Sequence, residues 1–228
     1  SVRSRISKAL RMQNDSPTKT TIGQNDFQWG LRTYVMGVVN MTPDSFSGDG
    51  LGTNVPQAIK QALKFQQYGA DIIDVGGEST RPSTIYSDAV ATSQENELSR
   101  VIPVVKHLAK ELKIPISIDT SKSVVAREAI KAGASMINDV WGFKKDPNMA
   151  SVAVKFGVPV ILMHNQNHFE YLDLIQDIIN SLAIMRDEAL KMGIRSDKII
   201  LDPGMGFGKT YNQNLEILRR LDEFNVLD

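Results

Sequence analysis

The chain has 228 residues, which is enough for one domain of ordinary size with a substantial hydrophobic core. Its 26 basic residues balance 26 acidic ones, and its longest apolar runs are far too short to span a membrane, so we expect neither a nucleic-acid partner nor a membrane partner. Cysteine is absent, which excludes disulfides, thiolate metal sites and a cysteine nucleophile, and fits a reducing compartment.

Residues 1–11 begin the chain with four basic residues and no acidic one. Such a segment is typical of a transit peptide, but a solvated N-terminal tail is the simpler interpretation and the one that we adopt. We expect a tail and lead-in over residues 1–33, followed by a single domain over residues 34–228.

After the tail, short β-type runs alternate with segments whose apolar residues recur at helical spacing. Strands are predicted, in chain order, over residues 34–39, 71–76, 115–120, 135–140, 159–164 and 198–203. Helices are predicted between and after them, over residues 54–70, 95–112, 123–134, 147–157, 171–193 and 212–224. Six βα units in succession indicate a parallel sheet covered by helices.

Polar residues stand at or just after the end of nearly every predicted strand. They are Asn40, Asp119, Asn138 and Asp139, His164 and Asn165, and Asp202, while the second strand runs through Asp74 into the sequence GGESTRP. In a (β/α)8 barrel the carboxyl ends of all strands surround one mouth, so these groups would converge there. An open doubly wound sheet also binds ligands at strand ends, but at a single crevice. The pattern favours the barrel and leaves the open sheet as the alternative.

Taken singly, the polar stretches have ordinary structural interpretations. The sequences NMTPDSFSGDG (40–50) and ESTRP (78–82) are rich in turn formers, and Asp119 suits the cap of the helix that follows it. His164 lies in no HxH or HExxH pattern, so a hydrogen-bonded histidine is a simpler interpretation than a metal ligand. DPGMGFGKT (202–210) ends like a phosphate-binding loop, but its glycine spacing does not match GxxxxGK[ST].

Together and in this order, the stretches NMTPDSF, GGESTRP, SIDTSKSVVAREAIKAGA, INDVWG, LMHN and LDPGMGFGK resemble dihydropteroate synthase. The resemblance runs from about Tyr34 to the C-terminus. It implies a (β/α)8 TIM barrel, of which this chain holds about six βα units, with the last two missing. It also implies a cytoplasmic homodimer of folate biosynthesis that is a sulfonamide target. With Mg2+, such an enzyme joins p-aminobenzoate to 7,8-dihydropterin-CH2-diphosphate and releases 7,8-dihydropteroate and diphosphate.

The resemblance assigns the pterin and the metal to residues at strand ends. Asn40 is expected to bind Mg2+ and the diphosphate. Asp119, Asn138 and Asp202 are expected to hydrogen-bond the pterin ring, because carboxylates and amides match the donors of its edge. Met163 is expected to pack against the ring. Asp119 and Asn40 are the expected catalytic residues: the carboxylate of Asp119 stabilises the positive charge that is left when diphosphate departs, and Mg2+ takes the negative charge of the leaving group.

The p-aminobenzoate side is assigned to Thr80, Arg81 and Pro82, together with Gly206 and Phe207. Two features depart from the family pattern. Ser83 follows ESTRP where the family usually has glycine, and the loop after it is a few residues longer than usual. The family's last two units normally bring a Lys for the pterin and an Arg and a His for the diphosphate, and none of these can be named in this chain.

Two rival functions are considered beside the synthase. One is a pterin-binding barrel without catalytic activity, and the other is a barrel that binds a folate for methyl transfer. The TPDSF and ESTRP loops argue against methyl transfer, because they serve diphosphate and p-aminobenzoate, which that reaction lacks. The synthase is therefore the favoured interpretation.

Overall fold

The computed structural model describes residues 19–41, 54–78 and 92–227. Some of the predictions above fall outside these residues. They concern the N-terminal tail up to residue 18, the TPDSF stretch, and Thr80, Arg81, Pro82 and Ser83 of the ESTRP loop.

The centre of the molecule is a parallel sheet of six strands, as the alternating pattern predicted. The strands are β3 (Met36–Asn40), β4 (Ile72–Gly76), β5 (Ile116–Asp119), β6 (Met136–Asp139), β7 (Val160–Met163) and β8 (Ile199–Asp202). Their order in space, β3-β4-β5-β6-β7-β8, is their order along the chain. A doubly wound sheet reverses its strand order at a switch point, and this sheet does not. The strands therefore wind in one direction, as in a (β/α)8 barrel, and the prediction of that fold class is confirmed.

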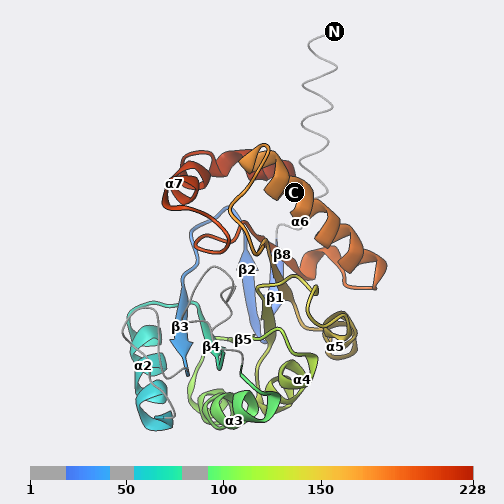
Figure 1. Cartoon of the computed structure of the whole chain (residues 1–228). Helices are drawn as coiled ribbons and strands as arrows, with labels where there is room; N and C mark the ends of the chain where they lie inside the picture. Colours follow the sequence, from blue (N-terminus) through green and yellow to red (C-terminus); the bar gives the residue numbers. More distant parts are fainter. Residues whose placement is uncertain (1–18, 42–53, 79–91, 228) are drawn as a thin grey trace.

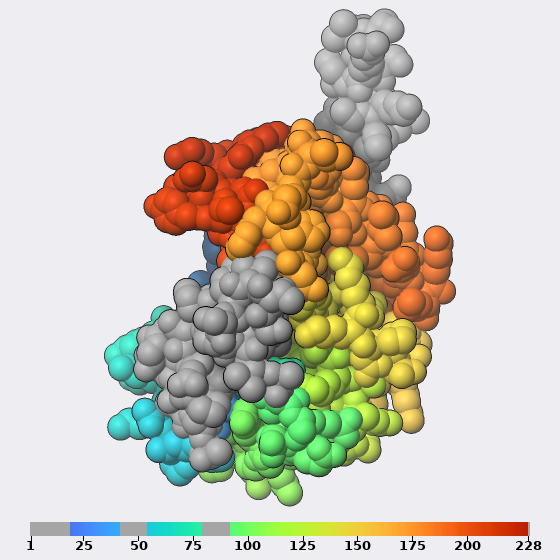
Figure 2. Space-filling view, in the orientation of Figure 1, coloured from blue at the N-terminus to red at the C-terminus, as the bar shows by residue number. Residues whose placement is uncertain are grey.

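Helices cover the outer face of these strands (Figure 1). They are α2 (Val55–Gln67), α3 (Gln94–Glu111), α4 (Ser123–Ala132), α5 (Asn148–Phe156), α6 (Leu174–Lys191) and α7 (Tyr211–Arg219), with the short 3-10 helices η1 (Ser196–Lys198) and η2 (Leu221–Leu227). Local sequence explains their ends: the side chains of Asn54, Ser93 and Asp173 cap the starts of α2, α3 and α6. Figure 2 shows the segments from α3 (green, at the bottom) to α7 (red, at the upper left) following one another in chain order up the right side and over the top of the molecule.

The last predicted helix, over residues 212–224, is only partly correct. The α-helix ends at Arg219 and the chain continues as 3-10 helix. Arg220 lies at the junction and forms ion pairs with Glu216 on one side and Glu223 on the other. The periodic apolar pattern continues through this junction, which is why the sequence predicts one helix where the structure has two.

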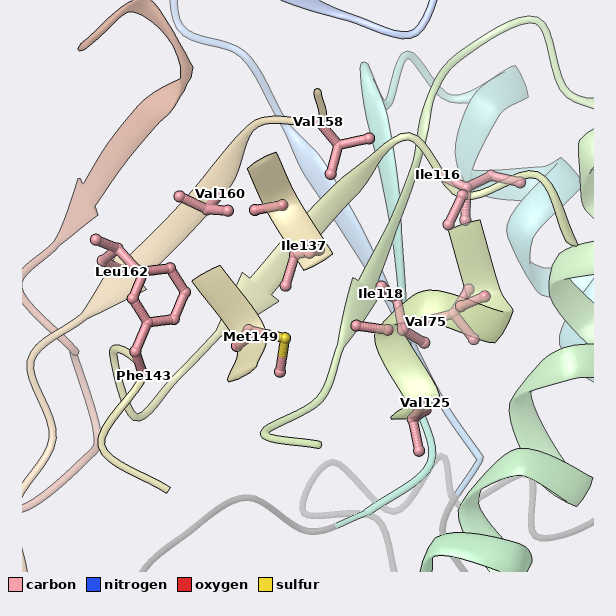
Figure 3. Close-up of a cluster of buried hydrophobic side chains, with 14 of the residues drawn as sticks. Val75, Ile116, Ile118, Val125, Ile137, Phe143, Met149, Val158, Val160 and Leu162 are labelled. Atoms are coloured by element: carbon pink, nitrogen blue, oxygen red, sulfur yellow. The ribbon is translucent and has the colours of Figure 1, made fainter. Parts of the chain in front are cut away.

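The main core lies between the sheet and the helices. Val75, Ile118, Ile137 and Val160 occupy neighbouring positions on four successive strands. All four are buried, and they belong to one apolar cluster with helix residues such as Met149 (Figure 3). Because side chains alternate along a strand, the residues before and after each of these four on its own strand point to the other face of the sheet, inside the barrel.

A β-hairpin that the sequence did not predict closes the opposite end of the barrel. It consists of β1 (Lys19–Ile22) and β2 (Asn25–Gln28), joined through Gly23 at a positive φ of 60°. Ile22 and Phe27 pack with residues near the amino ends of the barrel strands, among them Ile72 and Met136. The hairpin thus seals the end remote from the predicted site. The prediction of a tail and lead-in over residues 1–33 did not anticipate it, because four-residue strands carry too little pattern to be recognised.

Candidate active site at the carboxyl ends of the strands

Four site positions lie side by side because the strands are in register at their carboxyl ends. Asn40 pairs with Gly76, Gly76 with Asp119, and Asp119 with Asn138. A Cβ atom on Gly76 would lie 3.3 Å from Oδ2 of Asp119 and 3.4 Å from Oδ1 of Asn40. The side chains of Asn40 and Asp119 therefore approach each other over a glycine that has no side chain of its own. This is the convergence that the polar strand ends predicted.

Asp74 supports this row from one layer deeper in the barrel. Nδ2 of Asn138 donates a hydrogen bond of 3.0 Å to Oδ2 of Asp74. The bond commits the amide nitrogen of Asn138 to the interior and leaves its Oδ1 available as an acceptor. Asp74 is buried, and burial raises the pKa of its carboxyl although the bond from Asn138 acts in the opposite direction. In the sequence Asp74 stands out only as part of a strand, and nothing there indicates that it orients Asn138.

Asp119 carries the most perturbed carboxyl of the row. Burial raises its pKa well above the ordinary value, and the negative charges of Asp74, Glu97, Asp139 and Glu78 raise it further. Its Oδ1 is buried and has no hydrogen-bond partner among the residues that the structure describes. A buried, unpaired carboxylate oxygen is costly unless a donor or a cation meets it. The position is therefore suited to a ligand that brings hydrogen-bond donors or positive charge.

Asp202 ends β8, beside Met163 at the end of β7. Its Oδ1 accepts a hydrogen bond of 2.7 Å from the backbone N–H of Gly204, and burial raises the pKa of its carboxyl. Gly204 has a φ of +75°, and a Cβ atom there would lie 2.0 Å from the carbonyl oxygen of His164. Only glycine permits this approach, so the loop after β8 lies directly against the chain that leaves β7.

An apolar cluster adjoins these polar groups. Val140, Trp141 and Met163 form it, with the partly buried Phe207 packed against them. Met163 and Phe207 were predicted site residues, whereas Trp141 was not, although it follows directly after the INDV stretch. Its indole Nε1 is buried without a hydrogen-bond partner in the described part of the chain. The ammonium of Lys145 lies 4.3 Å from the centre of the Trp141 ring.

Asp139 does not join the site although its strand position suggested it. Its Oδ1 accepts from the backbone N–H of Trp141 and its Oδ2 from that of Phe143, both at 2.9 Å. Phe143 has a positive φ of 67°, which is unusual for a residue with a side chain. Asp139 thus holds the turn after β6, and burial raises its pKa to about 6.

The remaining predicted p-aminobenzoate residues lie in the loop after β8. The backbone N–H of Gly206 donates to Oδ1 of Asn214 at 2.8 Å, and the backbone N–H of Phe207 donates to the carbonyl of Gly204 at 3.2 Å. Phe207 is therefore bonded to Gly204, whose own N–H bonds Asp202, while the predicted companions Thr80, Arg81 and Pro82 are outside the described residues.

The described residues at the strand ends could bind Mg2+ only if water or substrate oxygens completed its coordination shell. Within the described residues, no group of three or more His, Cys, Asp or Glu side chains is placed to hold a metal ion. Mg2+ is commonly held by one or two protein oxygens, with waters and substrate phosphates completing its shell. Oδ1 of Asn40, with Oδ2 of Asp119 on the other side of Gly76, fits that description.

Residues 36–228 match the sequence profile of the family described as Pterin binding enzyme. Over 206 residues the chain is 50% identical to the dihydropteroate synthase of Clostridium beijerinckii, covering 90% of this chain and 75% of that protein. None of the described helices has the length and apolar character needed to cross a membrane.

Solved structures agree with the sequence match. A Yersinia pestis dihydropteroate synthase in complex with a sulfonamide drug superposes with a TM-score of 0.83 at 38% identity, covering 92% of this chain and 76% of that one. A Xanthomonas albilineans dihydropteroate synthase in complex with 7,8-dihydropteroate superposes with a TM-score of 0.79 at 32% identity, covering 92% and 73%. The chain spans about three quarters of the length of these relatives. It belongs to the dihydropteroate synthases, within the family of pterin-binding enzymes.

Proposed function

We propose that this chain carries the pterin-binding and catalytic strand ends for the condensation of p-aminobenzoate with 7,8-dihydropterin-CH2-diphosphate. The observation that supports this most directly is the row formed by Asn40, Gly76, Asp119 and Asn138 at the carboxyl ends of four adjacent strands. Relatives of the same fold are dihydropteroate synthases, and one of them was solved with 7,8-dihydropteroate. The products of the reaction are 7,8-dihydropteroate and diphosphate.

Pterin recognition is assigned to three acceptors and an apolar side chain. The pterin edge presents an amino group and ring N–H groups, which need acceptors. Asp119 and Asp202 supply carboxylates, and Asn138 supplies its Oδ1, since its nitrogen is already bonded to Asp74. Met163 offers an apolar surface to the ring face.

Catalysis is assigned to the electrostatics of Asp119. Departure of diphosphate leaves positive charge on the exocyclic carbon and the pterin ring. An ionised carboxylate in a buried position stabilises such charge more strongly than it would in water. The negative groups that raise the pKa of Asp119 add to the same field. The aniline nitrogen of p-aminobenzoate then attacks the carbon and forms the new C–N bond, and it releases one proton to water or to the departing diphosphate.

The diphosphate is assigned to the side of Asn40. Mg2+ bound there would neutralise the negative charge that gathers on the leaving diphosphate. Gly206 and Phe207 are assigned to the p-aminobenzoate side, where we also place Thr80, Arg81 and Pro82. The Yersinia pestis relative was solved in complex with a sulfonamide drug, and in this chain we expect sulfonamides to compete with p-aminobenzoate at that side. A cytoplasmic homodimer remains our prediction for the assembly.

The decisive experiment is the substitution Asp119→Asn, which keeps the shape of the side chain and removes its charge. We expect diphosphate release to fall by about a hundredfold or more, as happens when a group that stabilises transition-state charge is removed. Calorimetry with the pterin substrate should show weaker binding. Asp187→Asn, which neutralises an exposed carboxylate on α6, is the matched control and should leave both measurements unchanged.

Three outcomes separate the candidate functions. Wild-type turnover in a folded Asp119→Asn protein would contradict the assigned role. Pterin binding by the wild-type chain without diphosphate release would favour the non-catalytic barrel. Binding of a folate, with no affinity for the pterin diphosphate, would favour methyl transfer.

A further inference from the structure

Lys209 is a buried cation that the proposed reaction does not yet use. It lies at the end of the loop after β8, just before Thr210, which caps α7. Only 3% of its surface is exposed. Burial of an ammonium costs free energy unless hydrogen-bond acceptors replace the lost water. We therefore expect acceptors around Nζ of Lys209.

The ammonium meets three acceptors, which matches its three N–H donors. Nζ lies 3.0 Å from Nδ1 of His164, 3.3 Å from the carbonyl oxygen of His164 and 2.8 Å from the carbonyl oxygen of Phe207. His164 is buried, and burial together with the charge of Lys209 lowers its pKa to about 3. The imidazole is therefore neutral, and its Nδ1 accepts from the ammonium.

These bonds join the two chain segments that carry the pterin and p-aminobenzoate residues. His164 follows Met163 at the end of β7, and Phe207 belongs to the loop after β8. The same loop is pressed against β7 at Gly204, where a Cβ atom would lie 2.0 Å from the carbonyl oxygen of His164 and 3.2 Å from Nζ of Lys209. Lys209 thus ties the loop down where Phe207 packs against the cluster of Met163 and Trp141.

The charge of Lys209 also acts on Asp202. Its positive charge lowers the pKa of the Asp202 carboxyl, against the raising effect of burial, and Asp202 in turn favours the charged form of Lys209. Among the described residues, the titratable groups that face the ammonium are His164, directly after β7, and Asp202, at the end of β8. Pterin recognition needs Asp202 as an ionised acceptor, so the cation favours the form of Asp202 that binds.

We propose that Lys209 is a positioning residue, whose ammonium fastens the loop after β8 onto the end of β7 and presents Asp202 and Phe207 to the two substrates. The proposal rests on the proposed function. Lys209 does not touch the substrates in this assignment, and it acts through Asp202 and Phe207.

The protonation of Lys209 gives the proposal a distinctive pH dependence. Burial lowers its pKa to about 7. Above that pH the neutral amine has only two N–H donors for three acceptors, and the charge beside Asp202 is lost. Pterin affinity should therefore fall as the pH rises through about 7. Stability should change in the opposite direction, because an unfolded lysine keeps its proton to a higher pH and folding stability rises wherever the unfolded state binds more protons.

The opposite signs distinguish a positioning role from a merely structural one. The experiment measures pterin-substrate binding by calorimetry and the free energy of unfolding, between about pH 6 and about pH 9, for wild type and Lys209→Met. We expect Lys209→Met to bind about tenfold more weakly than wild type at the acid end, as loss of a charged hydrogen bond predicts. We also expect it to lose the fall in affinity that wild type shows as the pH rises. Lys191→Met, on the exposed last turn of α6, is the control.

A second variant keeps the test valid if Lys209→Met does not fold. Arginine stays charged across the whole pH range of the experiment. Lys209→Arg should therefore bind the pterin substrate as well at the alkaline end of the range as at the acid end. The proposal would be overturned if pterin affinity changed equally with pH in wild type and in both variants. It would also be overturned if the pterin affinity of wild type rose with pH together with its stability. Failure of the wild-type chain to bind pterin at any pH would instead overturn the proposed function.

Discussion

The strands in the middle of the sheet are more deeply buried than the two strands at its edges. Every residue of β4 and β7 is buried, whereas β8 is only partly buried along its whole length, and Val38 of β3 is 46% exposed. Within the described residues β3 and β8 each have one neighbouring strand, while the four strands between them have two. A closed (β/α)8 barrel pairs all its strands, so the edges are where further strands would add.

This difference divides the candidate site. Asp119 and Asn138 stand on the enclosed strands β5 and β6, while Asn40 and Asp202 stand on the edge strands β3 and β8. The enclosed pair is held by buried neighbours, including the bond from Asn138 to Asp74. The edge pair depends more on local contacts, such as the loop that Lys209 ties to β7. Residues of one site can therefore differ in how rigidly the fold holds them.

The largest effect should come from truncating an enclosed core residue. Ile118→Ala removes a fully buried side chain on β5 and should lower the free energy of unfolding by about 3–4 kcal/mol, because it leaves a cavity. Ile200→Ala, on the edge strand β8, removes a partly buried side chain and should cost about half as much. Urea unfolding followed by circular dichroism measures both. Equal costs would mean that the edge is as well enclosed as the centre.

The same pair of variants can sharpen the comparison. In a protein extended by two further βα units that pair the edges, Ile200→Ala should become nearly as costly as Ile118→Ala. A cost for Ile200→Ala that stays unchanged would show that the added residues do not cover β8.

A somewhat smaller effect is expected from the ion cluster beside the enclosed strands. Nζ of Lys122 lies 2.5 Å from Glu78 and 2.6 Å from Glu97, which is fully buried and also accepts from Thr120. Lys122→Met leaves the charge of Glu97 buried without its partner and should cost about 3 kcal/mol. Arg220→Met is the control, since Arg220 pairs with Glu216 and Glu223 at the surface and should matter far less.

Thermal unfolding of both variants would test this contrast. A loss for Arg220→Met as large as that for Lys122→Met would contradict the distinction between the enclosed and the exposed ion cluster.

The smallest effect concerns the pH dependence of stability. Burial raises the pKa of Asp119 in the folded protein, so the folded state holds its proton to a higher pH than the unfolded state does. Stability from this group is therefore fully present below the ordinary aspartate pKa and is lost as the pH rises through the folded pKa. Asp119→Asn should be at least as stable as wild type at neutral pH, and its stability should vary less with pH.

Denaturant titrations over the acid-to-neutral range measure this, with Asp187→Asn as the control. A neutral-pH loss of stability in Asp119→Asn would mean that the ionised carboxylate has a partner that stabilises the fold. Together with lost turnover, unchanged or increased stability would indicate that Asp119 is kept for function.

Much of the architecture could be predicted because its signals are local. Apolar runs such as VPVILM and helix stops such as Gly133 and Gly157 act within a few residues, and the six predicted strands match those of the structure closely. The hairpin of β1 and β2 could not be predicted in this way. Its two short strands are stabilised by burying Ile22 and Phe27 against strand residues that are distant in sequence.

The sequence by itself determined the order of strands and helices along the chain and the set of polar residues that end the strands, because these follow from periodicity and chain connectivity. The tertiary structure decided that the strands wind in one direction, because their order in space depends on pairing between distant segments. Only the tertiary structure decided what each polar residue does. Asp119 and Asp139 both end predicted strands, yet Asp139 bonds the backbone of its own turn while Asp119 keeps a buried oxygen free of described partners. In the sequence, Lys209 belongs to a stretch that ends like a phosphate-binding loop but has the wrong glycine spacing. In the fold it is a buried cation. The reason is that hydrogen-bond partners, burial and pKa depend on neighbours from other strands, whose positions no local pattern records.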